Sequence, residues 1–341
     1  MTRSGKLLNL KMKGIRSLPQ TTHLRDREEI RDRIGVMMRQ EGSTYKCRDY
    51  IRRRQVKCFD NSSVLICDQV KGLCYLDHQD DHMVAPSSVD TSCREKMCEW
   101  SYRIIDHFHA DREIVAVSFS YLDRFLDSCN CDKMSFKLAA MTTLYIATKI
   151  YNAREIPMSA LAELSRGEYE PKHIAEMERK ILLTLSWHVH PPTTQCVMSH
   201  LYTIFPNSQP SVKRTVFQRA SFFAELSVFH YSFVTRPISA IAIAALLNSM
   251  EGLDRSQGSS ELQAEFLERV ELETDLKYDL HNIEALRDEL WEVYGSSQQY
   301  KYDAMPFTTP QRSPTPSVIE KSDENLGDSP VCVSYMDRYA A

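Results

Sequence analysis

Apolar side chains recur at three- and four-residue steps along two stretches of the chain between residues 90 and 190. This spacing places them on one face of a helix in each stretch. They are Met97, Trp100, Ile104 and Phe108 in the first stretch and Ile174, Met177, Ile181 and Leu185 in the second. Between these stretches, residues 138–150 are apolar nearly all round, which predicts a helix that is buried on every side. The amphipathic helices are therefore expected to pack around it.

Start and stop signals divide the same region into five helices. Asp90 precedes the first helix, Glu113 lies in the first turn of the second, and Pro171 fits the first turn of the fifth. Gly167 ends the short fourth helix, and the proline pair at 191–192 ends the unit. The predicted helices cover about 91–108, 111–130, 135–150 and 158–165, with a fifth that begins near 171.

A second run of helices repeats this order. Its predicted helices cover about 193–205, 208–231, 235–250, 261–270 and 281–294. The third of them is again apolar nearly all round and rich in alanine. We therefore predict an all-α chain with two five-helix domains in tandem, over residues 90–190 and 191–295, and no strands.

The helical pattern stops after Gly295. Five of the fourteen prolines fall between Pro306 and Pro330, among serine, threonine and acidic residues, so residues 296–341 are predicted to be a disordered tail. Four Ser/Thr-Pro pairs in this tail are possible sites for a proline-directed kinase, and the alternative is chance pairs in a polar segment. The candidate residues are Thr309, Ser313, Thr315 and Ser329.

The charge of the chain is divided unevenly. Residues 1–57 hold 16 Lys or Arg against 6 Asp or Glu, whereas the rest of the chain holds 26 against 40. We expect residues 1–89 to form a basic, loosely structured arm that could hold one helix. Its arginine clusters at 25–27, 31–33 and 52–54 suit a nuclear address or a nucleic-acid contact. The alternative is a solvated arm whose interleaved acids satisfy the arginines.

Composition sets broad limits on the class of protein. A hydrophobic content of 43% in 341 residues is enough for two cores. No apolar run reaches the length of a membrane span, and the N-terminal segment lacks the apolar centre of a secretory signal. The ten cysteines suit reduced thiols. The expected location is the nucleus and the cytoplasm, with no membrane contact.

Candidate chemistry is sparse. Cys67, Cys74, His78 and His82 invite a zinc site, but their spacing lacks the tight knuckle of structural zinc sites, so we predict no metal. No phosphate-binding glycine loop, zinc-protease motif or nucleophile elbow occurs. The sequence therefore predicts a binding scaffold that is not an enzyme and needs no cofactor.

Four motifs, in register with the predicted helices, resemble successive parts of the cyclin box. They are the sequences at 97–100 (MCEW), 121–126 (YLDRFL), 147–149 (ATK) and 177–182 (MERKIL). The second unit continues the likeness at 224–227 (AELS), and the turn at 155–157 is similar to that of D-type cyclins. The resemblance covers about residues 90–294 and implies two cyclin-box domains.

The resemblance also implies a partner. In cyclins, the residues that match Lys149 and Glu178 hold the N-terminal lobe of a cyclin-dependent kinase near its mobile C-helix, and those that match Ile150, Leu182 and Trp187 form the apolar part of that surface. The chain is thus expected to be a non-catalytic activator of a kinase. Without the resemblance, Lys149 is a cation at a helix C-terminus, and Glu178 pairs locally.

Two further sites follow from the resemblance. Arg94 and Asp123 match a structural pair that ties the first helix of the box to the second. Met97 and Trp100 match a substrate-docking patch, which Lys96 should weaken because it replaces an apolar residue.

The residues after Lys149 and the charge of the chain leave alternatives open. Ile150, Tyr151 and Asn152 stand where many cyclins carry acids, which leaves open an unusual kinase partner. A second hypothesis is a cyclin-fold transcription adaptor, similar to general transcription factor IIB, or a transcriptional-kinase cyclin. The net acidic character of residues 58–341 makes nucleic acid an unlikely partner.

Overall fold

The computed structural model describes residues 20–59, 89–151, 156–206, 209–251, 259–274, 276 and 279–296. Within these ranges the chain is helical and has no strand. The helices are α1 (Gln20–Gly42), α2 (Tyr50–Phe59), α3 (Thr91–His107), α4 (Glu113–Ser128), α5 (Lys133–Tyr151), α6 (Met158–Leu164), α7 (Pro171–Thr184), α8 (Thr194–Ile204), α9 (Pro210–Phe229), α10 (Ile238–Met250), α11 (Ser259–Glu273) and α12 (Leu280–Ser296), with a 3₁₀ turn, η1 (Tyr231–Phe233).

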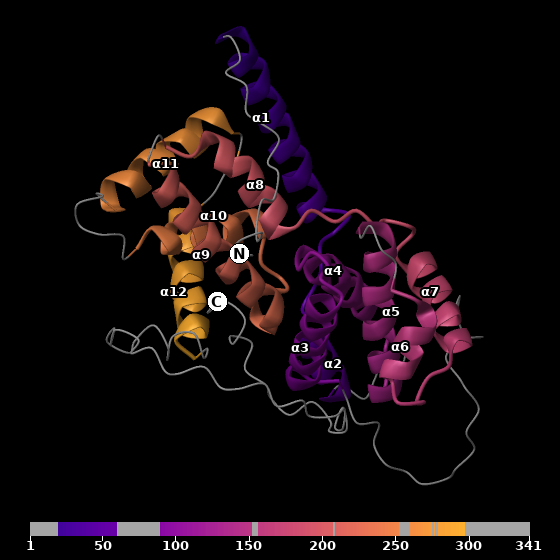
Figure 1. The fold of residues 1–341 in the computed structure, drawn as a ribbon. Coiled ribbons are helices and arrows are strands. Elements are labelled where there is room, and N and C mark those ends of the chain that lie inside the picture. The colour runs from indigo at the N-terminus through magenta and orange to yellow at the C-terminus, as the bar shows by residue number, and fades with distance from the viewer. Residues whose placement is uncertain are drawn as a thin grey trace, which may run out of the picture.

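Helix α5 is the centre of the first unit. Every residue from Leu138 to Thr148 is buried, and α5 packs against α4 on one side and α7 on the other (Figure 1). Asp90 begins the unit as an N-cap, because its side chain accepts a hydrogen bond from the N–H of Cys93. The apolar helix predicted from the sequence is therefore the buried axis of this unit.

Helix α10 has the same position in the second unit. All residues from Ser239 to Met250 are buried, and α8, α9, α11 and α12 pack around the helix. Thr193 caps α8 by accepting a hydrogen bond from the N–H of Cys196. The prediction of an all-helical chain with two helical units in tandem is confirmed for the described residues, whereas the stated boundaries between domains stay a prediction.

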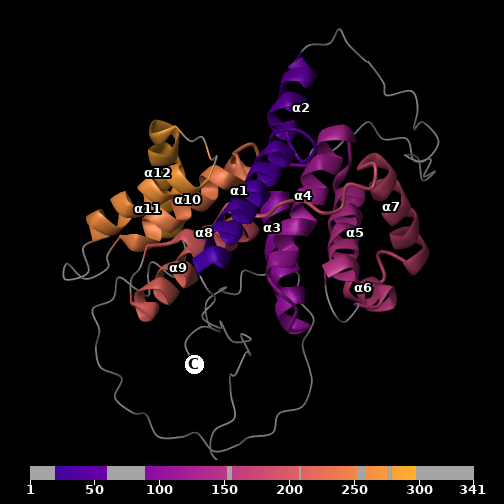
Figure 2. The same ribbon diagram turned by 90° about the horizontal axis from the view of Figure 1, so that it is seen from above.

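The N-terminal arm differs from the expectation. Instead of a loosely structured segment, its described part holds two helices that pack on both units. Ile34 and Met37 of α1 are buried in the core of the second unit, and Tyr50 and Ile51 of α2 are buried in that of the first. Figure 2 shows α1 running between α8 and the α3–α4 pair. The sequence of this arm shows only weak helical periodicity, because its few buried apolar residues pack against two different units.

Several predictions fall on residues outside the described ranges. They include the zinc quartet within 60–88, Asn152, the first residue of the turn at 155–157 and the Ser/Thr-Pro pairs of the tail. In the part of the chain that the structure describes, no helix is long and apolar enough to span a membrane.

Candidate functional site

Lys149 and Glu178 meet on the outside of the first unit. Lys149 lies in the last turn of α5 and Glu178 in the middle of α7, two helices that pack together. The Lys149 Nζ is 3.0 Å from the Glu178 Oε1, and the side chains are 44% and 15% exposed. The Lys149 ammonium also lies 5.4 Å from the centroid of the Tyr145 ring. The two charges predicted from the sequence therefore share one surface.

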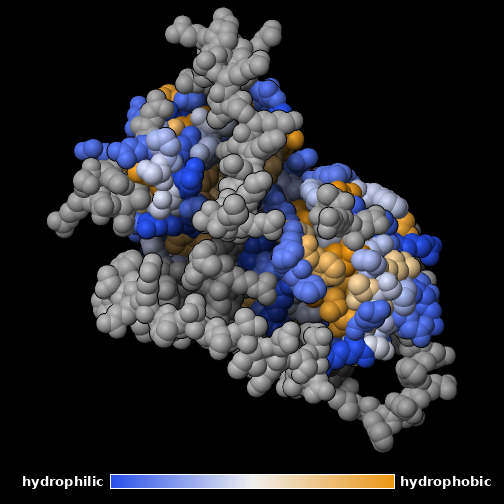
Figure 3. Space-filling model, viewed as in Figure 1, coloured by the Kyte–Doolittle hydropathy of each residue, from blue (hydrophilic) through white to orange (hydrophobic). Residues whose placement is uncertain are grey.

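Large apolar side chains are exposed in the last turn of α5, on α7 and just after α7. Ile150 and Tyr151 follow Lys149 and are 37% and 43% exposed, and Leu183 and Trp187, on and just after α7, are 55% and 63% exposed. Figure 3 shows apolar surface gathered over the part of the first unit where α5 lies in Figure 1, with polar surface around it. Exposed apolar side chains of this kind are typical of a protein interface.

Leu182 is largely buried. It is only 9% exposed and packs in the core of the first unit, whereas its neighbour Leu183 points outward. Both positions are apolar, and the matched motif ends at Leu182, so the sequence alone favoured that residue. The kinase-binding role of Leu182 stays a prediction, because this residue follows Glu178 by four positions and so shares its face of α7.

Trp187 is held outward by an unusual turn. Ser186 and Trp187 have φ angles of 49° and 60°, in the left-handed region that non-glycine residues rarely adopt. The Trp187 N–H donates to the Leu182 carbonyl at 3.0 Å, and the His188 N–H donates to that of Leu185 at 3.0 Å. These bonds close the end of α7 and fix the direction of the Trp187 backbone.

Tyr151 connects the edge of this surface to the segment between the two units. Its hydroxyl lies 3.0 Å from the His190 Nδ1 and 3.3 Å from the Val189 carbonyl oxygen. Burial raises the pKa of Tyr151 to about 12, so the hydroxyl stays protonated at neutral pH. No pattern in the sequence indicates this contact.

Arg94 and Asp123 form a buried ion pair at the junction of several elements. The Arg94 Nε and Nη2 donate to the two Asp123 oxygens at 2.9 and 2.8 Å, and the side chains are 2% and 8% exposed. The Arg94 Nη1 donates to the carbonyls of Val228 and Phe229 at 2.9 and 3.0 Å. Burial alone would lower the pKa of Arg94, but the Asp123 carboxylate raises it above its usual value.

The pair also reaches the N-terminal arm. The Tyr50 hydroxyl donates to the Asp123 Oδ1 at 2.9 Å, and burial raises the pKa of Tyr50 well above its usual value. The pair thus joins α3, α4, the end of α9 and α2. The sequence indicated only the tie between the first two helices.

A second ion-pair network joins the two units. Arg112 donates to both oxygens of Glu225 on α9, at 3.0 and 2.9 Å, and to both oxygens of Asp106, at 2.7 and 2.8 Å. Burial raises the pKa of Glu225, although Arg112 acts to lower it.

The predicted substrate patch lies on α3. Met97 and Trp100 are half-buried and pack against the first core, while Lys96 beside them is exposed. Among the described residues, no group of three or more His, Cys, Asp or Glu side chains could hold a metal ion.

A cavity of about 360 Å³ lies between the arm, α4 and the end of α9. Arg124 stands in its wall, 7% exposed, and donates to the carbonyls of Ser120 and His188, both at 3.0 Å. Its guanidinium lies 4.8 Å from the centroid of the Tyr45 ring. These contacts fasten the arm and the segment between the units to α4.

Two family descriptions match the chain. "Cyclin, N-terminal domain" matches residues 61–190, and "Cyclin, C-terminal domain" matches residues 196–306.

Among curated relatives, G1/S-specific cyclin-D1 of Mus musculus is 22% identical over 210 residues, which cover 60% of this chain and 69% of that protein. G2/mitotic-specific cyclin-B of Hydra viridissima is 24% identical over 177 residues, which cover 52% of this chain and 44% of that protein. Among solved structures, the viral cyclin from herpesvirus saimiri is similar, with a TM-score of 0.49 and 18% identity over 61% of this chain and 88% of that one.

Proposed function

Because this chain belongs to the cyclin family, we propose that it is a regulatory subunit that binds and activates a cyclin-dependent kinase. The observation that carries the proposal is the Lys149–Glu178 ion pair inside a rim of exposed apolar side chains. We assign Ile150 and Trp187 to that rim and Leu182 to its less exposed part, and we name this surface the docking face.

The docking face suits a helix of the kinase. Burial of its exposed apolar side chains would supply affinity, at about 25 cal/mol per Å² removed from water before the costs of association are subtracted. The two charges would fix the register of the incoming helix. The Glu178 Oε2 accepts no hydrogen bond among the described residues, so it can accept one from the partner.

Activation follows from selective binding. A surface that fits only the kinase form with its C-helix turned inward shifts the kinase population toward that form. The catalytic groups of the kinase then assemble, and this chain contributes none of them. The cost of holding Trp187 in a left-handed conformation is consistent with a residue kept for binding.

The test is the double variant Lys149→Ala, Glu178→Ala. We expect it to lose kinase co-purification and kinase activation while its far-UV circular dichroism stays that of the parent chain. The matched control is Lys137→Ala, Glu168→Ala, which removes another Lys–Glu ion pair between the same helix and the segment before α7. Activation of a kinase by the Lys149/Glu178 double variant would contradict the assignment.

A role in the cell cycle is the favoured form of this proposal. It is supported by the names of the relatives, which are specific to G1/S and to G2/mitosis. The alternative is a transcription adaptor similar to factor IIB, or a transcriptional-kinase cyclin. Affinity purification with identification of the bound kinase discriminates between these roles, and salt-dependent binding of the chain to duplex DNA would favour the adaptor.

Other parts of the proposal concern recruitment and location. We assign weak substrate capture to Met97 and Trp100, and regulation by phosphorylation to the Ser/Thr-Pro pairs of the tail. The proposed location is the nucleus and the cytoplasm.

A further inference from the structure

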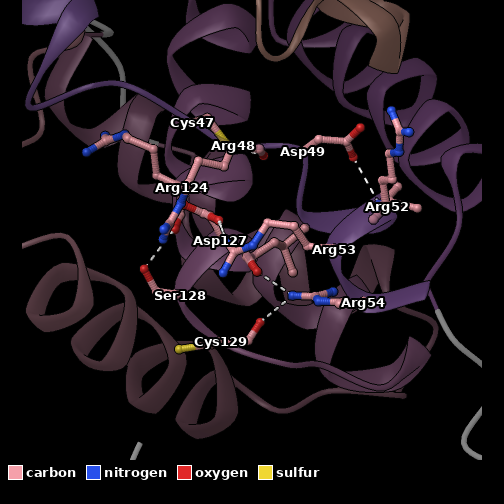
Figure 4. Close-up of polar contacts among 12 residues, drawn as sticks. Cys47, Arg48, Asp49, Arg52, Arg53, Arg54, Arg124, Asp127, Ser128 and Cys129 are labelled. Atoms are coloured by element: carbon pink, nitrogen blue, oxygen red, sulfur yellow. Dashed lines mark hydrogen bonds and ion pairs between the residues drawn. The ribbon is translucent and has the colours of Figure 1, made fainter. Parts of the chain in front are cut away.

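Two arginines of the N-terminal arm converge on one carboxylate at the end of α4. The Arg48 Nε lies 2.9 Å from the Asp127 Oδ2, and the Arg53 Nη1 lies 2.6 Å from the Asp127 Oδ1 (Figure 4). Asp127 is 10% exposed, while Arg48 and Arg53 are 61% and 42% exposed. The carboxylate is thus covered by two guanidinium groups that face the solvent.

A third arginine lies beside them. The Arg54 Nη2 donates to the carbonyls of Leu126 and Cys129, the latter at 2.6 Å, at the C-terminal end of α4. This contact satisfies carbonyls that have no partner inside the helix. Three guanidinium groups therefore meet a single carboxylate and the partial negative charge of a helix end.

The cluster of Arg48, Arg53 and Arg54 keeps a surplus of positive charge and of hydrogen-bond donors. Asp127 uses one nitrogen of Arg48 and one of Arg53. Both terminal amino groups of Arg48, and the Nε and Nη2 of Arg53, contact no acceptor in the described part of the chain. Attachment of the arm to α4 explains the bonds to Asp127 but leaves these donors unused.

The contacts also position the two groups. Asp127 holds both guanidiniums close together although their like charges repel each other, so a second anion placed over them would be stabilised by both. Because each guanidinium is already held by the carboxylate, less side-chain entropy is lost when that anion binds.

We propose that Arg48 and Arg53, with Arg54 beside them, form a docking site for a phosphorylated serine or threonine segment of a partner protein. A phosphate group has nearly two negative charges and three acceptor oxygens, so it matches two guanidinium forks that have donors left over. A lone carboxylate supplies only one charge, and Asp127 already fills that role.

Nearby acids make a nucleic acid a poorer occupant. Asp49 precedes α2, where it accepts hydrogen bonds from the Arg52 N–H and the Tyr231 hydroxyl, and Asp132 is exposed just after the end of α4. A polyanion that continued past the arginines would meet these carboxylates, and the whole chain has a net charge of -4. A compact dianion on a peptide avoids them.

The site is tested by fluorescence anisotropy on the full chain without any kinase. The probe is a short labelled peptide with one phosphoserine, compared with the same peptide carrying serine and with duplex DNA. We expect the phosphopeptide to bind at least about tenfold more tightly than either, and Arg48→Gln, Arg53→Gln to abolish this preference. Arg214→Gln, Arg219→Gln on α9 is the charge-matched control and should bind as the parent does.

A second variant separates the site from general charge and from loss of fold. Arg48→Lys, Arg53→Lys keeps both charges opposite Asp127 but loses the forks, so it should bind the phosphopeptide about tenfold more weakly while its circular dichroism is unchanged. Parent-like affinity in this variant would overturn the proposal. So would equal binding of serine and phosphoserine peptides, or tighter binding of DNA. Lys149→Ala, Glu178→Ala should bind the phosphopeptide normally, so failure of kinase docking would leave this result untouched.

Discussion

Removal of the Asp123 carboxylate should destabilise the whole chain. In Asp123→Ala, the Arg94 guanidinium is left at 2% exposure without a counter-ion. Breaking a buried ion pair from one side costs about 3–5 kcal/mol. The Tyr50 hydroxyl, which donates to the same carboxylate, loses its acceptor, and this adds about 1 kcal/mol or more. A total near 5 kcal/mol is a large share of the roughly 5–15 kcal/mol that stabilises a typical folded protein.

Substitution of Arg94, the other member of the pair, shows whether the unpaired buried charge causes this loss of stability. Arg94→Met in the parent chain should also cost about 3–5 kcal/mol, because Asp123 then stays buried and unpaired. In the Asp123→Ala background the same change removes the orphan cation, so it should cost little or restore part of the stability. Part of this gain in stability is offset, because the carbonyls of Val228 and Phe229 lose the hydrogen bonds that the Arg94 Nη1 donates.

Urea unfolding followed by far-UV circular dichroism measures the free energy of unfolding of the parent chain, the two single variants and the double variant. The control is Arg269→Ala, which removes a pair with Glu265 on the surface of α11 and should cost less than about 1 kcal/mol. Costs below about 1 kcal/mol for both single variants, or a double variant equal to the sum of the singles, would refute the reasoning.

Three further predictions concern the docking face and the pH dependence of stability. Leu182→Ala should lower the free energy of unfolding by about 2–5 kcal/mol, whereas Ile150→Asp should leave the urea midpoint nearly unchanged and weaken kinase co-purification. Trp187→Gly relieves a left-handed conformation, so the thermal midpoint should hold or rise while kinase binding falls; a lower midpoint would contradict the assigned strain. Burial raises the pKa of Glu113 above its usual 4.5, so the folded chain binds this proton more tightly than the unfolded chain. The free energy of unfolding should therefore fall as the pH rises from the usual pKa to the raised pKa of the folded chain. Glu113→Gln should remove this part of the fall in urea midpoints measured across the mildly acidic range.

The helices were predictable because their ends are marked in the sequence. Asp90, Pro171 and Thr193 stand where helices begin, and, for every helix between 91 and 296 whose end was predicted, the observed end lies within a few residues of it. The two helices that are apolar all round were also identified as the buried ones, because no other position suits such a helix in water. Local punctuation and composition were enough for these features.

The surface around Lys149 was predictable only in part. The motif that ends at Leu182 identified the right turn of α7, but two adjacent leucines do not reveal which of them faces outward. The exposure of Trp187 depends on two non-glycine residues with positive φ, which no periodicity indicates. Side-chain direction at the end of a helix is set by tertiary contacts that the sequence pattern does not contain.

The arm was the largest difference because its partners are distant in the sequence. The Arg31 Nη2 donates to the Leu272 carbonyl at 2.9 Å, and Glu41 accepts from the Ser239 N–H at 3.0 Å near the start of α10. Such contacts leave no local pattern, whereas the i,i+4 pair of Glu29 with Arg33 matches the expected interleaving of acids and bases.

The uneven charge of the chain has a physical explanation in these contacts. The basic arm lies against a net acidic remainder, and the arginines of its second helix bind Asp127 and the carbonyls at the end of α4. Part of the positive charge at 52–54 is therefore used to hold the arm on α4. Charge that is used for folding is normally neutralised in the process, as Asp123 neutralises Arg94. At Asp127 the number of arginines exceeds the number of carboxylates, and this excess is what distinguishes a docking site from an attachment point.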